Sequence, residues 1–483
     1  MLHELKFDNC SHSRDPLVSC ALEGVAAVLA GIEDIAMVIH SPQGCSSTVA
    51  GAYDMHEIDF FRRKIACSRL FETDIIMGAT DKLRDLIRQA DTVFGTRVIF
   101  VVGTCAADII GEDIEAVCRA MQPEVSAKLI PVMAGGFRGD TFDGMNLGLK
   151  ALLPFIEDGA SLPAGAARKH GDAESGHPFA AGSPAVPGVM HTANLLVPQA
   201  NLNPTWWADY RWVTAVLQRM GVAVNAVVPR EIPLDRLRET SSADVNILLS
   251  HDAGHDFARR VSAPKMNLIL DGLPLPVGIE NTGRWLRELG RECHAAGEAE
   301  RIIREGESKV QDILRKRGLM IIPRYRNCRI AVSADCTIGI PLVRMLFSEL
   351  EMIPELLLFR SDPPGARTML ERELSDMGIR PATVFAADGW KIRSALAATE
   401  VDAVLGSAWE KYMAEERGVR IFFDVIFPVN RDRYIDRQYF GYDGMLNILE
   451  AMGNGWETGL RSKRIKWEQF EREPFHENSC VCE

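Results

Sequence analysis

Three cysteines stand where an apolar run gives way to a glycine-bearing turn or a helix start. Cys20, Cys45 and Cys105 lie in the contexts PLVSCALEG, IHSPQGCSSTVAG and VVGTCAADIIGED. At a strand-to-helix junction, the unsatisfied N–H groups of the helix start can stabilise a thiolate. Three such junctions on neighbouring parallel strands would converge outside the strand ends, where α/β sheets bind ligands. Thiolates held in this way suit an iron–sulfur cluster, whereas a purely structural interpretation makes them small buried apolar side chains.

The elements around these cysteines follow an alternating pattern of short β-branched runs and helical stretches. This pattern predicts an α/β fold with parallel, doubly wound sheets. A charged helix is expected over Glu298–Arg317, and a linker or long loop over Glu157–Pro187, which is rich in Gly, Ala, Ser and Pro. A first helix is expected over Asp81–Ala90, and the expected strands are Ile35–His40, Arg97–Val102, Lys128–Met133, Val245–Ser250, Met266–Leu270, Arg329–Ser333, Ala403–Leu405 and Arg420–Val425.

Composition narrows the classes of protein that the chain can belong to. Its 483 residues are enough for two to four domains, and 47% apolar with 25% charged residues is ordinary for a globular protein. The net charge of −12 disfavours nucleic acid and anionic membrane surfaces as partners. No apolar stretch approaches the ~20 residues that span a bilayer. Eleven cysteines without a small-domain framework, and a start without an export signal, favour metal ligation in a reducing cytoplasm.

The contexts of the cysteines carry a more specific signal. His40–Cys45 matches an H-x-x-x-G-C turn, and Thr104–Asp113 matches a T-C-x-x-x-[IV]-I-G-[DE]-D loop. Glu72–Ala79 matches E-x-x-[IV]-V-F-G-G with methionine and alanine replacing phenylalanine and the last glycine, and Gly441–Gly444 matches G-[YF]-[DE]-G. With these four motifs in order, the chain resembles the nitrogenase component 1 family over most of its length.

The resemblance implies three Rossmann-like α/β domains, which we place at residues 1–182, 183–325 and 326–483. It implies that Cys20, Cys45 and Cys105 bind iron and hold a cluster at the interface with a homologous subunit. The cluster would be of the P-cluster type, 8Fe-7S, or a 4Fe-4S cluster. The expected assembly is an α2β2 heterotetramer that is served by a separate homodimeric, ATP-hydrolysing iron protein. No phosphate-loop motif appears in this chain, so ATP hydrolysis is assigned to that partner.

Two absences favour the β-type subunit of this family, which does not hold the active-site cofactor. The segment Asn246–His255 lacks the cysteine of α-type chains, and Phe427–Tyr434 lacks their histidine. By contrast, Ile130–Gly139 looks more like an α-type chain. Docking of the iron protein is expected around Ile75–Met77 by resemblance.

The resemblance leaves several substrates open. The short arm before Cys20 and the Met77-Gly78-Ala79 replacement favour a nitrogenase-like reductase that does not fix nitrogen. Reductive C–S cleavage of small thioethers, as in methylthio-alkane reductase, is our first choice, and dinitrogen reduction is the second. A non-catalytic scaffold for cofactor assembly and a tetrapyrrole reductase remain as alternatives.

The other candidate side chains are given structural roles. His251 and His255 have the i, i+4 spacing of a metal-chelating helix, but Gly254 weakens that helix, so we expect a polar turn. The remaining noteworthy thiols are expected to pack in the core or to lie in a C-terminal tail: Cys67, Cys336, Cys480 and Cys482.

Overall fold

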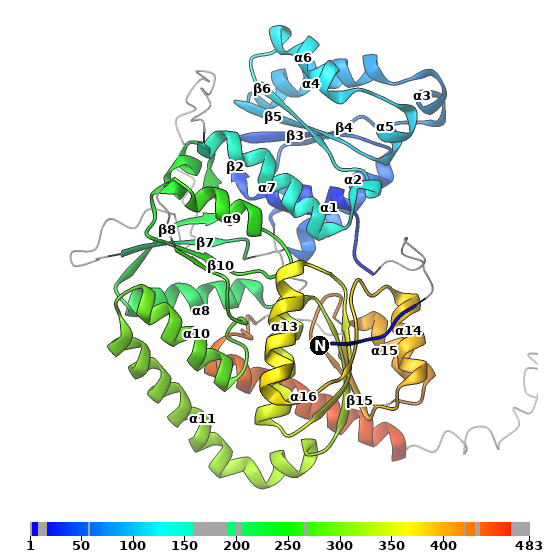
Figure 1. Cartoon of the computed structure of the whole chain (residues 1–483). Coiled ribbons are helices and arrows are strands. Elements are labelled where there is room, and N and C mark those ends of the chain that lie inside the picture. The colour runs from blue at the N-terminus through cyan, green and yellow to red at the C-terminus, as the bar shows by residue number, and fades with distance from the viewer. Residues whose placement is uncertain are drawn as a thin grey trace, which may run out of the picture.

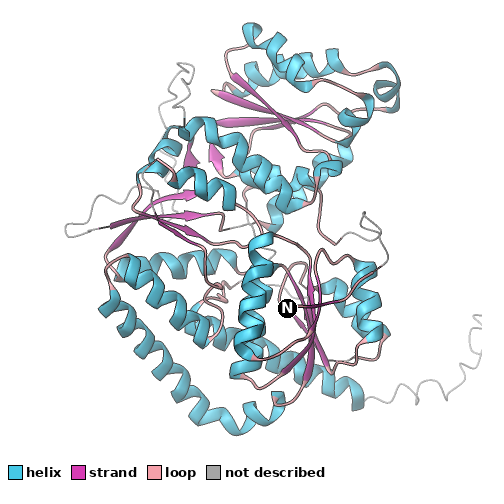
Figure 2. Ribbon diagram, viewed as in Figure 1, coloured by secondary structure: helices cyan, strands magenta, loops and turns pink. Residues whose placement is uncertain are grey.

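The computed structural model describes residues 2–7, 17–56, 58–157, 191–198, 204–264, 268–419, 421–429 and 435–464. Within these ranges the chain forms an α/β protein with two four-stranded sheets, one six-stranded sheet and a two-stranded pair. Figures 1 and 2 show the three larger sheets in separate layered units, each flanked by helices. Every ladder between named strands is parallel, as the alternating pattern predicts.

The first sheet has the strand order β4-β3-β5-β6. Its strands are β3 (Ile35–His40), β4 (Ile65–Cys67), β5 (Val98–Gly103) and β6 (Lys128–Met133). Alternate residues of β3 and β5 enter two different cores, as expected for strands that are covered on both faces. One face packs against α1 (Ala21–Ala30), α2 (Gln43–Met55) and α7 (Thr141–Glu157), and the other against α4 (Thr80–Phe94) and α6 (Ile114–Met121).

Two glycines set the close approach of α1 to α7. A Cβ atom at Gly24 would lie 1.9 Å from the carbonyl oxygen of Thr141, and one at Gly144 would lie 2.0 Å from that of Ala21. Any larger residue would therefore push the two backbones apart. This contact fixes the start of α1, and with it Cys20, against the start of α7.

The second sheet has the order β11-β10-β7-β8. Its strands are β7 (His191–Leu196), β8 (Val222–Val228), β10 (Val245–Leu248) and β11 (Leu268–Leu270). The accompanying helices are α8 (Trp206–Arg219), α9 (His255–Ser262), α10 (Ile279–Glu292) and the long α11 (Ala296–Tyr325), which contains the predicted charged helix. The pair β2 (Ile32–Glu33) and β9 (Ile232–Pro233) joins the first unit to the second.

The third sheet has the order β1-β14-β13-β12-β15-β16. Its strands are β1 (His3–Glu4), β12 (Arg329–Ala334), β13 (Ile353–Phe359), β14 (Ala382–Val384), β15 (Ala403–Gly406) and β16 (Ile421–Asp424). Its helices are α12 (Cys336–Arg344), α13 (Pro364–Met377), α14 (Gly389–Ala398), α15 (Ala408–Glu416) and α16 (Gly441–Arg464). The division into three domains at residues 182 and 325 stays a proposal, and β1 lies outside the unit to which that division assigns it.

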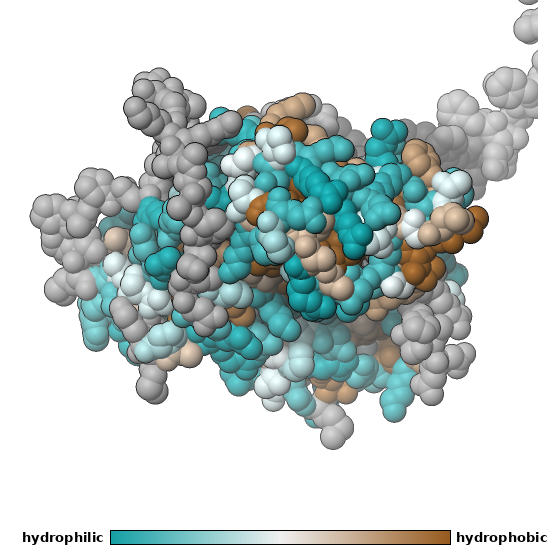
Figure 3. All heavy atoms as spheres, turned by 90° about the horizontal axis from the view of Figure 1, so that it is seen from above, coloured by the Kyte–Doolittle hydropathy of each residue, from teal (hydrophilic) through white to brown (hydrophobic). Residues whose placement is uncertain are grey.

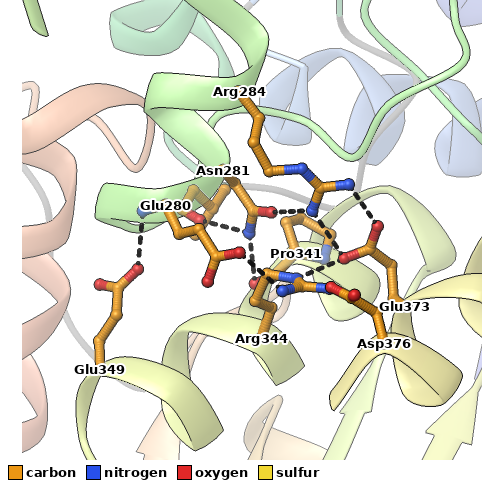
Figure 4. Close-up of polar contacts among 9 residues, drawn as sticks. Glu280, Asn281, Arg284, Pro341, Arg344, Glu349, Glu373 and Asp376 are labelled. Carbon is orange, nitrogen blue, oxygen red and sulfur yellow. Dashed lines mark hydrogen bonds and ion pairs between the residues drawn. The ribbon is translucent and has the colours of Figure 1, made fainter.

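A buried ionic network joins the second and third units (Figure 4). Arg344, whose side chain is 4% exposed, pairs with Glu373, which is 3% exposed. Glu373 also accepts two hydrogen bonds from Arg284 of α10, at 2.9 and 2.8 Å. The guanidinium of Arg344 reaches Glu280 and Asp376, each at 2.7 Å. Because these side chains come from α10, α12 and α13, the network fixes how the two units pack.

Some expectations fall outside the described ranges. The predicted linker lies in residues 158–190 except for its first residue, and Cys480 and Cys482 lie in the undescribed C-terminal stretch. Residues 430–434, which end the segment that lacks the α-type histidine, also lie outside the described ranges. Every helix that the structure describes is too short or too polar to span a lipid bilayer.

Candidate functional site

The three predicted cysteines all lie at the carboxyl-end edge of the first sheet. Cys20 is the N-cap residue of α1, directly before Ala21. Cys45 lies in the first turn of α2, which follows β3. Cys105 is the first residue of α5 (Cys105–Ile110), which follows β5. Since β3 and β5 are neighbouring parallel strands, both of their following turns open on the same edge.

A glycine turn after β6 brings two of these cysteines together. The backbone N–H of Gly136 donates a hydrogen bond of 2.8 Å to the sulfur of Cys105. A Cβ atom at Gly136 would lie 3.3 Å from Cβ of Cys20 and 3.4 Å from Sγ of Cys105. Cys20 and Cys105 thus approach the same residue, and a side chain at position 136 would be in tight contact with both.

The third cysteine, Cys45, has a pKa that depends on the charges of the other two. Burial raises the pKa of the Cys45 thiol, and the charges of Cys105, Cys20 and Cys67 raise that pKa further. The helix start therefore does not lower the pKa of Cys45, because burial and mutual repulsion of the thiolates outweigh it. Thiolates that repel one another at a shared site are suited to bind cations, since a metal offsets the repulsion and displaces the thiol protons.

The donor atoms that the three cysteines offer are thiolate sulfurs, which iron–sulfur clusters use as ligands. Across the described part of the chain, no three His, Cys, Asp or Glu side chains form a group that could hold a single metal ion. In an iron–sulfur cluster the cysteine ligands bind different iron atoms, so their sulfurs need not meet at one point. Three thiols at one edge of the sheet are therefore a donor set that such a cluster can use.

A buried pair, His40 and Glu112, connects the end of β3 to the loop after α5 and so supports the loops that contain these cysteines. Nε2 of His40, the last residue of β3, contacts Oε2 of Glu112 in the loop after α5. The other oxygen of Glu112 accepts a hydrogen bond of 2.5 Å from the backbone N–H of Ala79, directly before α4. The Thr104 hydroxyl donates to the carbonyl of His40 at 2.9 Å. Motif residues that are far apart in the sequence are thereby joined behind the cysteines.

Apolar side chains are exposed around this end of the first unit. Ile76 and Met77 of α3 (Glu72–Met77) are 80% and 84% exposed, and Phe61 is 95% exposed. Ile109 of α5 and Phe137 of the glycine turn are exposed as well. Seen from above, hydrophobic atoms gather at the edge of the molecule on the side where α3 lies (Figure 3). Exposed apolar surface of this kind marks contact with other proteins.

The turn that contains His251 follows β10 and precedes α9, as predicted, but it is buried. His251 is fully buried before the helix, and both of its ring nitrogens lack a hydrogen-bond partner. Burial lowers its pKa to about 4, so the ring is neutral. His255 begins α9, with Nδ1 3.5 Å from Asp271. The two rings therefore do not share one helix, which explains why their spacing does not produce a chelate.

Cys336 is enclosed at the junction of the second and third units. It is fully buried, and burial raises its pKa well above the ordinary value for a thiol. The carboxylate of Asp252 accepts hydrogen bonds from the backbone N–H groups of Cys336 and Thr337, at 3.0 and 2.9 Å. Asp252 thus stabilises the start of α12 from the neighbouring unit, and the Cys336 thiol packs. The pattern of the sequence did not reveal this contact, because the residues are far apart in the chain.

Comparisons with known proteins agree with the motifs. A family model described as "Nitrogenase component 1 type Oxidoreductase" matches residues 20–457. The chain is 23% identical over 480 residues to the nitrogenase molybdenum-iron protein beta chain of Methanococcus maripaludis, covering 91% of this chain and 93% of that one. It is 33% identical over 137 residues to the corresponding alpha chain, covering 25% of this chain and 29% of that one. The solved structure "Nitrogenase Cp1 at pH 6.5" superposes with a TM-score of 0.72 at 16% identity, covering 99% of this chain and 98% of that one.

Proposed function

The chain belongs to the nitrogenase component 1 type oxidoreductase family, and from that premise we propose that it shares an iron–sulfur cluster with a homologous α-type partner. In this role it is the β-type subunit of a nitrogenase-like reductase. The observation that carries the proposal is the convergence of Cys20 and Cys105 on Gly136, with Cys45 electrostatically coupled to both.

The β-type assignment is supported by the relatives and by the second unit. A nitrogenase beta chain matches along almost the whole chain, whereas an alpha chain matches over only 137 residues. The segment Asn246–His255, which lacks the α-type cysteine, is enclosed between units here, and Ser250 and His251 are fully buried.

Three ligands are proposed for the shared cluster: Cys20, Cys45 and Cys105. Iron–sulfur clusters transfer single electrons, at potentials set by hydrogen bonds to the sulfurs and by solvent exposure. In this chain the Gly136 N–H bond to Cys105 is one such hydrogen bond, and the partial burial of Cys45 limits its contact with solvent. A P-cluster-type 8Fe-7S cluster is our first choice for this site, and a 4Fe-4S cluster is the second.

An ATP-hydrolysing iron protein is the proposed electron donor. The exposed side chains of Ile76 and Met77 on α3 support docking there, because an apolar surface beside the cysteine loops is available to a partner. The His40–Glu112 pair connects the start of α4, next to α3, to the loop after α5. A partner bound at α3 would therefore contact the same framework that positions Cys105.

For the substrate, we propose reductive cleavage of small thioethers as in methylthio-alkane reductase. The departures at Met77-Gly78-Ala79 support this choice. Dinitrogen reduction is the second candidate, because the similarity to a nitrogenase beta chain spans most of the chain. Reduction assays of the assembled complex with dimethyl sulfide and with dinitrogen separate the two.

The cluster itself is tested by exchanging one ligand in the assembled complex. Cys45→Ala should lower the iron content and the cluster's electron paramagnetic resonance signal, because one anionic ligand is lost. The matched control is Cys118→Ala in the same unit. Cys118 is 4% exposed, and burial raises the pKa of its thiol to about 12, so it has a packing role and its loss should spare the iron. Full iron content in the Cys45→Ala complex would contradict the assignment.

A further inference from the structure

A fourth cysteine, Cys67, lies at the same edge of the first sheet. It ends β4, where it pairs in register with Ile39 of β3. Paired residues on neighbouring strands direct their side chains to the same face of a sheet. Ile39 is buried in the core beneath α1 and α2, whereas Ala66 packs against the opposite core. The side chain of Cys67 therefore lies on the face that carries Cys20 and Cys45.

The contacts of Cys67 place it against the loop that positions Cys45. Its sulfur lies 3.4 Å from Oγ of Ser41 and 3.5 Å from the carbonyl oxygen of Ser41. It also lies 4.0 Å from the carbonyl oxygen of Pro42. Ser41 and Pro42 lead directly into α2, whose first turn contains Cys45. Cys67 thus supports this loop from the neighbouring strand.

The Cys67 sulfur has hydrogen-bond partners of both kinds, because it faces the carbonyl oxygens of Ser41 and Pro42 and also accepts from one backbone N–H. The backbone N–H of Arg69 donates a hydrogen bond of 3.4 Å to its sulfur, as Gly136 does to Cys105. The charge of Cys67 is also among those that act on Cys45. N–H donors at sulfur are the hydrogen bonds by which proteins stabilise cluster-bound thiolates. Cys67 and Cys105 therefore share both the sheet edge and the type of donor.

The other thiols of the described chain are different. Four are buried, and burial raises the pKa of each thiol, to about 12 for Cys118: Cys118, Cys293, Cys328 and Cys336. Cys67 is only half-buried, like the three predicted ligands. Its sequence context, Ala66-Cys67-Ser68-Arg69, contains neither a glycine turn nor a helix start, so its neighbours in the sequence do not mark it as a ligand.

We propose that Cys67 is a fourth cysteine ligand from this chain to the iron–sulfur group. On binding, the sulfur loses its S–H proton to solvent and forms a bond to iron, without a change of oxidation state at sulfur. With four cysteine ligands in place of three, this subunit would supply more of the ligands that bind the iron atoms. The inference rests on the proposed function, because it requires the group that Cys20, Cys45 and Cys105 are proposed to hold.

The test uses the assembled complex and its thiol reactivity. Iodoacetamide labelling, followed by mass spectrometry of the peptides, is carried out before and after removal of iron with a chelator. Cys67 is expected to stay unlabelled in the iron-loaded complex and to become labelled after chelation, in step with Cys45. Labelling of Cys67 in the iron-loaded complex, or no labelling after chelation, would overturn the proposal.

Two variants give a second measurement that does not depend on labelling. Cys67→Ser keeps an oxygen ligand and should retain most of the iron with a shifted paramagnetic resonance signal and midpoint potential. Cys67→Ala should bind less iron than the Cys118→Ala control. A Cys67→Ala complex with the parent's iron content, signal and potential would overturn the proposal. If this variant does not assemble, the labelling of the parent decides.

The two proposals fail in different ways. If the parent complex binds no iron, the proposed function is wrong and the role of Cys67 is lost with it. If the parent binds iron and Cys45→Ala loses it, but Cys67 is labelled freely in the loaded complex, only the fourth ligand is wrong.

Discussion

Glu349 gives the junction of the second and third units a sensitivity to pH. One carboxylate oxygen accepts a hydrogen bond of 3.1 Å from the backbone N–H of Glu280, in the first turn of α10 (Figure 4). The other oxygen is buried without a hydrogen-bond partner. Burial is the main cause that raises the pKa of Glu349 from 4.5 to about 7. The charge of Glu280 adds to this rise, and the backbone hydrogen bonds from the start of α10 oppose it.

The sign of the effect follows from proton linkage. Because the pKa is higher in the folded chain than in the unfolded chain, the folded state binds more protons between pH 4.5 and about 7. The contribution of Glu349 to stability is therefore retained at low pH and lost as the pH rises through about 7. At about 1.4 kcal/mol per pH unit, a pKa that moves from 4.5 to about 7 corresponds to at most about 3 kcal/mol.

The substitution Glu349→Gln isolates this effect, since glutamine keeps the shape and the acceptor oxygen but cannot ionise. At about pH 4 the variant should match the parent in free energy of unfolding, and at about pH 8 it should be more stable by up to about 3 kcal/mol. We would measure urea unfolding together with amide hydrogen exchange of the α10 peptide, because three units need not unfold in one step. Glu351→Gln is the matched control, since Glu351 is exposed and paired with Arg326 at the surface.

One outcome would refute the reasoning. If the stability difference between Glu349→Gln and the parent is the same at both pH values, the carboxyl group titrates as an exposed glutamate does. An equal pH dependence for Glu351→Gln would assign the effect to the general charge of the surface.

Four further outcomes are expected. Glu373→Ala should lower the free energy of unfolding by about 3 kcal/mol, the low end for a broken buried pair, because Arg344 keeps two other carboxylate partners. In a urea titration, the surface variant Glu288→Ala should lower the free energy of unfolding by less than about 1 kcal/mol, since the partner of Glu288, Arg291, is exposed. Purified without its partner, the chain should be poor in iron or aggregate through its exposed apolar surface, as assayed by metal analysis and gel filtration. His251→Ala should destabilise by about 1–3 kcal/mol and His255→Ala by less, with the iron content of the complex unchanged.

Each of these outcomes has a clear contradiction. Equal losses for Glu373→Ala and Glu288→Ala would show that the buried network does not hold the units together. A stable, fully metallated single chain would indicate a self-contained electron-transfer protein. Loss of product formation in the double variant of His251 and His255, with the cluster intact, would reverse the α-type and β-type assignment.

Local patterns in the sequence predicted the elements whose surroundings are simplest. Strands β3 and β6 are buried on at least one face, so their apolar runs are nearly continuous, and their bounds match the expected ones. The edge strand β4 and the short β1 were not predicted, because two or three residues carry no readable period. Their assignment depends on pairing with strands that are distant in the chain.

Local sequence signals also account for which residues of the site were predicted and which were not. Cys45 and Cys105 stand in motifs that mark a turn, so their position at the sheet edge could be inferred from neighbouring residues. Gly136 and Cys67 reach this edge through the register of β6 and β4, which only the folded sheet defines. The short G-G step at residues 135–136 was a usable signal, because adjacent glycines permit close approach to a third group.

The pairing of β1 with β14 has a consequence for how the chain is made. His3 and Glu4 lie at the very start of the chain, yet their hydrogen-bonded neighbours are Ala382 and Thr383. During synthesis the first two units can complete their sheets while this segment waits, because its partner strand leaves the ribosome only after most of the chain has been translated. The third sheet therefore forms last, and β1 joins it only after the first two units have folded. We expect pulse-labelled, ribosome-bound chains to protect β3 and β5 from proteolysis before they protect the first residues.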